Sequence, residues 1–451
     1  MRSIDEALII SDLHLAAEFN RGLFQADETL AEFLRDVRTN FRHVHLFLNG
    51  DVFDFLVLQQ RDGGLNLEDA ADQATAIVNS HSEVFKELSL LANSDEHELV
   101  ILAGNHDPEM ALPVVQKEIA RQLQSTGKHS PVQWLTSGEA ALFQVGDLKV
   151  LIEHGDQYDA WNWIDHEALR RVICLVSRNI SYQNIYKAPP GSQLVINRLN
   201  LLRDKFPWLQ TLQPLNATIL PLALEVILPS LSREDRTQVL KAVKEFNAAT
   251  VRSVIDYALL RLGSRNEYWD NDNEDRQILS DWLAEYHRSE AVWGDDHDPN
   301  GWLARAMLRL RKILVSQKLK SVAGKNLFFD IEAHDENYNA VVRLTEKGAN
   351  LVVHGHTHAA KAYQVGPSLY LNTGTWGQLT KLPAGEATDE VWGRYLEELK
   401  AGRADSITRP TFAWIKKQGI GTAASLFEWT TKGARALSTW NFANGQWEEE
   451  K

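Results

Sequence analysis

Five short segments of the sequence place oxygen and imidazole donors together, most of them directly after an apolar, strand-like run. They are Asp12-Leu13-His14, Gly50-Asp51-Val52-Phe53-Asp54, Gly104-Asn105-His106-Asp107, His154-Gly155-Asp156 and Gly355-His356-Thr357-His358. Carboxylate, amide and imidazole donors of this kind suit Mn²⁺, iron and Zn²⁺. A pair of such cations is used chiefly to hydrolyse phosphate esters and anhydrides. The segments therefore predict a two-metal site and a hydrolytic reaction, and they say little about the substrate.

The candidate metal ligands differ in what each can donate. Asp12 and His14 stand two positions apart at a predicted strand end, so both side chains can turn toward one cation. Asp51 is the natural bridging residue, because one carboxylate can donate an oxygen to each of two metals. Neutral donors complete the set, namely the amide oxygen of Asn105 and the imidazole nitrogens of His154, His356 and His358.

His106 follows a candidate ligand but is not needed as one, which makes it the candidate to protonate the leaving oxygen or stabilise the transition state. Asp107 or Asp54 would orient an imidazole from behind the ligands. We therefore predict His106 and Asp107 as catalytic residues. A hydroxide held between the two cations would be the nucleophile at neutral pH.

Each segment taken alone also has a simpler interpretation. A lone histidine is more often a structural residue, and His356-Thr357-His358 would equally serve a single metal. The Gly-Asn-His-Asp segment could be only a turn. The order of all five segments along the chain favours the two-metal site over a different metal use or a degenerate, inactive site.

The elements that position these segments alternate between strand and helix patterns. Apolar runs predict strands over 7–10, 44–48, 99–102, 142–145 and 148–152, and later over 351–353, 362–365, 369–371, 425–430 and 437–441. Helical spacing predicts helices over 27–39, 69–92 and 338–347. Ligands of an open α/β sheet gather at the carboxyl ends of its strands. The pattern therefore predicts an α/β domain with the site at one sheet edge.

The strand alternation stops between the fourth and fifth segments. Helical patterns over 167–177, 233–262, 277–288 and 303–319 replace it. We therefore predict a discontinuous catalytic domain over 1–160 and 331–451, interrupted by a helical insertion over 161–330.

The first part of this insertion mixes aromatic and basic residues. One interpretation is a lid that grips a second phosphate through Arg170, Arg171 and Arg178 while aromatic rings stack on a base or line an acyl groove. The other interpretation is a helical subdomain whose arginines form a solvated face.

Composition narrows the class of partner and the compartment. The chain has 451 residues and a formal net charge of −14, which disfavours a broad nucleic-acid surface without excluding a local basic groove. Its single cysteine, Cys174, suits a reducing compartment and lies in an apolar run that predicts a buried side chain. No run is long enough for a membrane span and the start is unlike a signal peptide. We expect a soluble, cytoplasmic protein, with peripheral membrane contact and oligomeric state left open.

Taken together, the five segments resemble those of the calcineurin-like metallophosphoesterase superfamily, over roughly residues 1–160 and 335–380. The resemblance implies a β-sandwich flanked by helices, with two sheets where the strand pattern indicates only one. It implies His106 as the catalytic histidine. It also implies a first metal held by Asp12, His14, Asp51 and His358, and a second held by Asp51, Asn105, His154 and His356.

Within the superfamily, the motif sequences most resemble those of the UDP-2,3-diacylglucosamine pyrophosphatase branch. The shared segments are Ser11-Asp12-Leu13-His14-Leu15, His154-Gly155-Asp156 and Tyr370-Leu371-Asn372-Thr373-Gly374-Thr375-Trp376. That branch carries arginine where this chain has His106, and its members are shorter. The lipid substrate of the branch is therefore not carried over.

The leading hypothesis is a phosphoesterase with two divalent metal ions, Mn²⁺ in first place and iron or Zn²⁺ as alternatives. It would hydrolyse a phosphodiester or pyrophosphate bond in a small nucleotide or nucleotide-linked substrate. A nuclease acting on DNA or RNA ends is the second hypothesis. The third is a non-catalytic, metal-bound scaffold that binds a partner through the helical insertion.

Overall fold

The computed structural model divides the chain into two compact units. One comprises residues 1–215, 326–381 and 404–451, and the other comprises 216–325 and 382–403. The structure describes residues 2–18, 22–57, 65, 67–123, 132–182, 185–196, 200–203, 206–212, 320, 323, 328–419 and 421–450. The helices expected over 233–262, 277–288 and 303–319 lie outside the described residues. The division at 160 and 331 stays a prediction, and residues 161–215 belong to the first unit.

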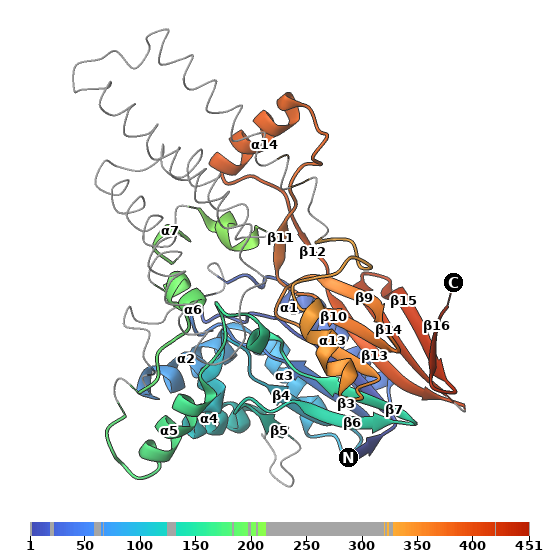
Figure 1. Ribbon diagram of the computed structural model, residues 1–451. Coiled ribbons are helices and arrows are strands. Elements are labelled where there is room, and N and C mark those ends of the chain that lie inside the picture. The colour runs from blue at the N-terminus through green and yellow to red at the C-terminus, as the bar shows by residue number, and fades with distance from the viewer. Residues whose placement is uncertain are drawn as a thin grey trace, which may run out of the picture. The chain divides into compact units, whose positions relative to one another are not determined.

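An eight-stranded sheet forms the larger layer of the first unit, in the order β16-β15-β14-β13-β2-β3-β4-β5 (Figure 1). Its parallel half contains β2 (Glu6–Ile10), β3 (Val44–Asn49), β4 (Glu98–Leu102) and β5 (Val132–Leu135). Its antiparallel half contains β13 (Thr411–Gln418), β14 (Gly421–Thr430), β15 (Gly433–Ala443) and β16 (Gln446–Glu449). The two halves join where β13 pairs with β2, so a late strand lies beside an early one.

A second, six-stranded sheet has the order β1-β6-β7-β8-β10-β9. It contains β1 (Arg2–Ile4), β6 (Ala141–Val145), β7 (Leu148–Ile152), β8 (Leu351–His354), β9 (Ala360–Val365) and β10 (Ser368–Thr373). Strands β7 and β8 are parallel, with Ile152 opposite Val353. The segments that begin at His154 and Gly355 therefore leave the sheet side by side.

The two sheets face each other across an apolar layer, in which Phe47 stacks on Phe143 with ring centroids 5.1 Å apart. Successive residues of β2 serve different layers. Ala7 and Ile9 face the other sheet, while Leu8 and Ile10 face the helices. A strand buried on both faces reads as a continuous apolar run, which hides the second sheet from a sequence pattern. The sandwich flanked by helices is confirmed, in place of one open sheet.

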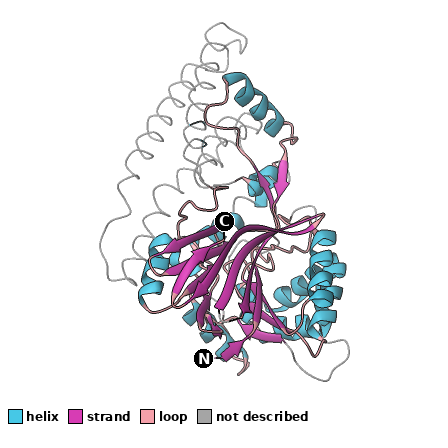
Figure 2. Cartoon of the chain, turned by 90° about the vertical axis from the view of Figure 1, so that its right-hand side faces the viewer, coloured by secondary structure: helices cyan, strands magenta, loops and turns pink. Residues whose placement is uncertain are grey.

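Helices cover both outer faces of the sandwich (Figure 2). The eight-stranded sheet packs against α1 (Asp27–Asn40), α2 (Leu67–Ser80), α3 (Ser82–Ala92) and α4 (Pro113–Leu123). The six-stranded sheet packs against α13 (Tyr338–Glu346), where Val341 meets Val352. The single helix expected over 69–92 is wrong: His81 separates α2 from α3, and its ring contacts Asp27 Oδ1 at 2.7 Å and Ala16 O at 3.0 Å.

Shorter elements follow the fourth segment and the second sheet. They are η2 (Pro108–Ala111), η3 (Asp156–Tyr158), α5 (His166–Val176), α6 (Pro190–Leu194), α7 (Asn200–Arg203), η5 (Pro207–Thr211), β11 (Gln378–Thr380) and β12 (Ser406–Thr408), with α14 (Asp389–Lys400) in the second unit. Cys174 is exposed, contrary to expectation, because α5 buries Leu169 and Val172 on another face. Within the described ranges, no helix has the length and apolar character needed to cross a membrane.

Candidate metal centre

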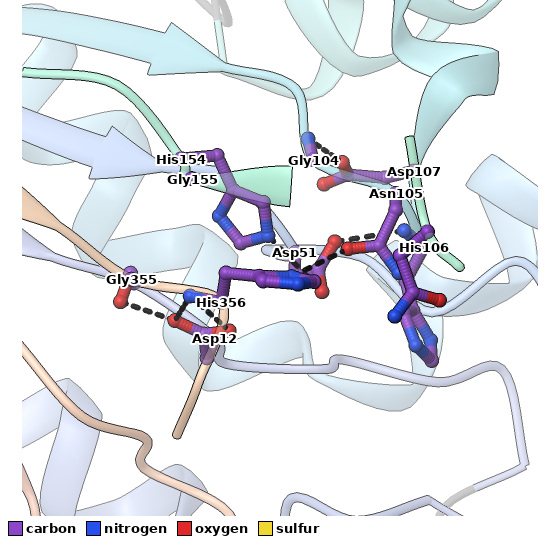
Figure 3. Close-up of polar contacts among 12 residues, drawn as sticks. Asp12, Asp51, Gly104, Asn105, His106, Asp107, His154, Gly155, Gly355 and His356 are labelled. Carbon is purple, nitrogen blue, oxygen red and sulfur yellow. Dashed lines mark hydrogen bonds and ion pairs between the residues drawn. The ribbon is translucent and has the colours of Figure 1, made fainter. Parts of the chain in front are cut away.

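The five predicted segments meet at one end of the sandwich, because each follows the carboxyl end of a strand. Asp12, Asp51 and Asn105 come after β2, β3 and β4 of the larger sheet. His154 and His356 come after β7 and β8 of the smaller sheet. Figure 3 shows their side chains gathered around Asp51. Asp12 and His356, which are 344 positions apart in the chain, thus lie in one cluster.

Five of the candidate ligands hold a left-handed backbone conformation that residues other than glycine rarely adopt. Their φ angles are 51° for Asp12, 51° for His14, 48° for Asp51, 68° for His356 and 58° for His358. Such conformations cost of order 1–3 kcal/mol each and persist only where the surroundings enforce them. Backbone hydrogen bonds from Asp12 N to Gly50 O at 3.1 Å and from His14 N to Asp51 O at 2.9 Å hold two of them.

Glycines allow the ligand side chains to lie against neighbouring backbone. A Cβ added at Gly104 would collide with the Asp51 carboxylate and come within 2.7 Å of His154 Cδ2. A Cβ added at Gly355 would collide with the Asp12 carboxylate. These two glycines are required by the side chains packed on them rather than by their own turn geometry.

One group of donors contains Asp12, His14, Asp51 and His358, whose ligand atoms all lie within 4.8 Å of one another. His14 Nε2 is 2.9 Å from His358 Nε2 and 3.9 Å from Asp51 Oδ2. His358 Nε2 is 3.4 Å from Asp12 Oδ1. The side chains of Asp12, His14 and Asp51 are buried.

A second group contains Asp51, His154 and His356, again with ligand atoms within 4.8 Å of one another. His154 Nε2 is 3.3 Å from Asp51 Oδ2, and His356 Nδ1 is 3.0 Å from Asn105 Oδ1. Asp51 therefore belongs to both groups. The structure brings together all seven residues predicted as metal ligands.

His154 provides the clearest test of whether these residues fit a metal. Its Nδ1 lies 2.9 Å from Asn49 O, which can only accept a hydrogen bond, so Nδ1 carries the proton. Its buried Nε2 has no hydrogen-bond partner among the described residues, and faces a carboxylate oxygen of Asp51. Burial disfavours a charge on His154, but the Asp51 carboxylate outweighs it and raises the pKa of His154 well above its ordinary value, so either a proton or a cation must lie between Nε2 and Oδ2. The donor set thus fits divalent metals.

Burial dominates the electrostatics of the cluster. It raises the pKa of Asp12 to about 6 and lowers the pKa of His14 to about 4. Burial also opposes a charge on His106, but the carboxylates of Asp51 and Asp54 outweigh it and raise the pKa of His106 to about 9. Buried carboxylates beside imidazole lone pairs are an arrangement that divalent cations stabilise.

His106 lies beside both groups and is held by two carboxylates. Its Nδ1 is 3.3 Å from Asp54 Oδ1, and its backbone N donates to Asp51 Oδ1 at 2.7 Å. Its ring meets the ring of His14 edge-on, with centroids 4.6 Å apart. The Asp54 carboxylate thus orients the imidazole and favours its protonated form.

Asp107 faces the backbone instead of an imidazole. Its Oδ1 accepts from Gly104 N at 2.6 Å, and its Oδ2 accepts from Val52 N at 2.9 Å and Phe53 N at 3.2 Å. The carboxylate therefore ties the loop after β4 to the loop after β3. This geometry suits a residue that positions Asp51 and Asn105.

Two residues outside the five segments also hold the site. Asp159 Oδ2 lies 3.1 Å from His356 Nε2, and Asn372 Nδ2 donates to Gly355 O at 2.7 Å. Asn372 lies in the segment from Tyr370 to Trp376, one of those that carry the family resemblance, so a role for it could be expected from the sequence. Asp159 follows the His-Gly-Asp segment by three residues, and no spacing rule singles it out.

The predicted substrate arginines lie on or just after α5 and are exposed. Arg171 lies 3.5 Å from Glu167, and Arg178 donates to the carbonyl of Cys174 at 2.8 Å. Arg203 in α7 is instead buried. The contacts described for Arg170, Arg171 and Arg178 do not reach the histidine and carboxylate cluster, and their role stays a prediction.

Comparisons with known proteins agree with this geometry. Residues 7–213 match the family described as calcineurin-like phosphoesterase. No curated protein sequence matches the chain.

The solved structures to which the chain is similar have low sequence identity and low TM-scores. A conserved uncharacterized protein, described as a predicted phosphoesterase, from Streptococcus pneumoniae TIGR4 is 9% identical, with 99% of this chain and 97% of that chain covered and a TM-score of 0.25. Vacuolar protein sorting 29 from Cryptosporidium parvum is 12% identical, with 98% of each chain covered and a TM-score of 0.27. A Vps29 single mutant from Entamoeba histolytica is 11% identical, with 25% of this chain and 51% of that chain covered and a TM-score of 0.16.

The alignment thus spans about half of the Entamoeba chain. The matched family covers the segments from Asp12 to His154, and the structure adds His356 and His358 to them. Residues 7–213 of the chain therefore match a calcineurin-like phosphoesterase domain, and this stretch contains the segments from Asp12 to His154.

Proposed function

We propose that the protein is a hydrolase that uses two divalent cations to cleave a phosphodiester or pyrophosphate bond in a nucleotide or nucleotide-linked substrate. One observation carries the two-metal part of this proposal. Asp51 Oδ2 is 3.9 Å from His14 Nε2 and 3.3 Å from His154 Nε2, so one carboxylate serves two groups of donors. A shared carboxylate is what a pair of neighbouring cations requires.

The donors divide between the two cations as their groups do. Asp12, His14, Asp51 and His358 would hold the first, and Asp51, Asn105, His154 and His356 would hold the second. When bound, such a pair supplies a water-derived nucleophile at neutral pH and polarises the phosphoryl oxygens. We propose Mn²⁺ as the native metal, since oxygen and imidazole donors suit it, with iron and Zn²⁺ as alternatives.

His106 is proposed as the residue that gives a proton to the leaving oxygen. Its Nδ1 is directed to Asp54, its pKa lies near 9, and a fifth of its side chain stays exposed. The protonated ring can therefore present Nε2 to a substrate near neutral pH. Asp54 orients this ring, and Asp107 holds the two loops that carry Asp51 and Asn105.

Aromatic and basic residues that come after His154 in the chain support the substrate class. Trp161 and Trp163 are half-buried there, and Arg203 in α7 is buried. Asn200 of the same short helix donates to Leu56 O at 2.7 Å, which fastens α7 to the loop after β3. Aromatic rings and a guanidinium near a phosphoesterase site suit a substrate with a base and a second phosphate.

The test measures hydrolysis of bis(p-nitrophenyl) phosphate with Mn²⁺ by wild type, Asp51→Asn and His106→Ala. Asp147→Asn, in the turn between β6 and β7, is the matched control. We expect Asp51→Asn to lose nearly all activity and to bind fewer than two Mn²⁺ per chain. We expect His106→Ala to keep two Mn²⁺ and to lose about 10²- to 10⁴-fold in kcat. Full activity of Asp51→Asn would overturn the two-metal proposal.

A panel of phosphoesters then identifies the substrate. It should contain nucleoside diphosphate-linked sugars and lipids, cyclic nucleotides and oligonucleotides. Turnover of the nucleotide-linked compounds supports the proposal. Chelator-sensitive cleavage of oligonucleotides alone would replace it with a nuclease, and metal binding without turnover of any compound would replace it with a scaffold.

A further inference from the structure

The imidazole of His356 is held at both of its nitrogens. Its Nδ1 lies 3.0 Å from Asn105 Oδ1, on the side of the second group of donors. Its Nε2 lies 3.1 Å from Asp159 Oδ2, on the opposite side of the ring. A carboxylate accepts hydrogen bonds but cannot donate them when ionised, so Nε2 carries the proton in this contact. If a cation occupies the second group of donors, the ring must be neutral; the contact with Asp159 then keeps the proton on Nε2 and leaves the lone pair on Nδ1, beside Asn105 Oδ1.

Asp159 is itself fixed by its neighbours. Its Oδ1 accepts from the backbone N of Trp161 at 2.8 Å, and its Oδ2 also accepts from Asn162 Nδ2 at 2.7 Å. The backbone N of Trp163 donates to Asp159 O at 2.9 Å and closes the turn. The carboxylate therefore cannot move away from His356 without breaking this turn.

The chain segment that carries Asp159 also contacts Asn105, the residue beside His356 Nδ1. Gly191 N donates to Trp161 O at 2.8 Å, so α6 lies against the Asp159 turn. The next residue, Ser192, is buried and donates from Oγ to Asn105 O at 3.4 Å. Asn105 and His356 are thus both supported by residues 159–192, which come after the His-Gly-Asp segment.

We propose that Asp159 is a positioning residue for the second cation and acts through His356. This inference rests on the proposed function, because it presumes that the second group of donors holds a metal. Asp159 sets the tautomer and the orientation of the ring, and it makes Nδ1 a stronger donor. Carboxylates behind a ligating histidine are worth about 10- to 100-fold in metal affinity.

The experiment titrates the metal-depleted protein with Mn²⁺ by calorimetry, and records the electron paramagnetic resonance spectrum at two equivalents. The variants are Asp159→Ala and Asp159→Asn. Asn keeps the size of the side chain and loses its charge, so it decides the matter should Asp159→Ala fail to fold. Asp165→Ala is the matched control, because Asp165 caps α5 in the same segment through Ala168 N.

We expect wild type to bind two Mn²⁺ and to show the spectrum of an exchange-coupled pair. Both Asp159 variants should keep one tight site, bind the second Mn²⁺ about 10- to 100-fold more weakly, and lose the coupled spectrum at low metal. Asp165→Ala should match wild type. Introducing Asp159→Ala into a His356→Ala background should cause little further loss, since the two residues act as one unit.

Two results would overturn the inference while leaving the proposed function intact. One is a wild-type second-site affinity in both Asp159 variants. The other is an equal loss of second-site affinity in Asp165→Ala, which would show that any disturbance of this segment weakens binding of the second Mn²⁺. Wild type that binds fewer than two Mn²⁺ would instead overturn the proposed two-metal function.

Discussion

Glu109 is a buried carboxyl group beside the metal centre, and its burial makes the stability of the protein depend on pH. It lies in η2, directly after the segment that ends at Asp107, and its side chain is buried. Burial raises the pKa of Glu109 to about 8, although its own backbone N–H partly offsets this. A carboxyl that stays protonated in the folded state but ionises in the unfolded state makes stability depend on pH.

The sign of this dependence follows from the two pKa values. Below the ordinary value near 4.5 both states bind the proton, and Glu109 contributes nothing. Between about 4.5 and about 8 only the folded state keeps the proton, so the free energy of unfolding falls as pH rises.

We expect Glu109→Gln to remove this slope. Between pH 5.5 and 7.5 the variant should gain about 2.5 kcal/mol relative to wild type, measured by urea unfolding of the metal-depleted proteins. Unfolding free energies of the two proteins that run parallel over this range would contradict the assignment.

The loops that follow neighbouring strands are connected to each other by hydrogen bonds, and these bonds hold the ligands in place. Asn372 at the end of β10 is fully buried and donates to Gly355 O at 2.7 Å and to Thr357 Oγ1 at 3.1 Å. Its Oδ1 accepts from Gly374 N at 2.9 Å. One amide side chain thus joins the loop after β10 to the loop that carries His356 and His358.

Asn372→Ala should therefore loosen the metal centre from a distance. It leaves a buried carbonyl and a buried N–H unpaired, which should lower the free energy of unfolding by about 2–4 kcal/mol. Mn²⁺ affinity should fall as well, because the loop at Gly355 loses its tether. Denaturant unfolding and Mn²⁺ titration check both effects, with Gln364→Ala, at the exposed residue of β9, as the control. Unchanged stability and affinity would contradict this account.

Some of the strands could be predicted from the sequence and others could not. Strands β2, β3 and β4 were predictable because each is an apolar run that ends in a polar segment, and those segments supplied candidate ligands. Strand β13 was not, because Lys416 and Lys417 interrupt its pattern and its register depends on β2. Asp159 was equally hidden, since its contact with His356 exists only after two distant loops have met.

The whole molecule should gain stability from the cations that its centre is built to hold. Metal binds the folded chain and has no such site on the unfolded chain, so each occupied site stabilises by mass action. At a free Mn²⁺ concentration of 100 times Kd, one site contributes about 2.7 kcal/mol.

We therefore expect the melting temperature to rise with Mn²⁺ and to fall when a chelator is added. Differential scanning fluorimetry across a Mn²⁺ series measures the shift. Asp51→Asn should lose most of it, because Asp51 belongs to both donor groups, while Asp147→Asn should keep it. A melting temperature indifferent to Mn²⁺ and to chelator would contradict the metal centre.

The pairing of β13 with β2 also has a consequence for synthesis. Ile9 lies opposite Ala413, so the strand that leads to Asp12 meets this partner only after roughly 400 further residues have left the ribosome. At 5–20 residues per second that takes about 20–80 s. One edge of β2 stays open for that time and can pair with other chains. Nascent-chain crosslinking should find chaperones on this strand until β13 emerges.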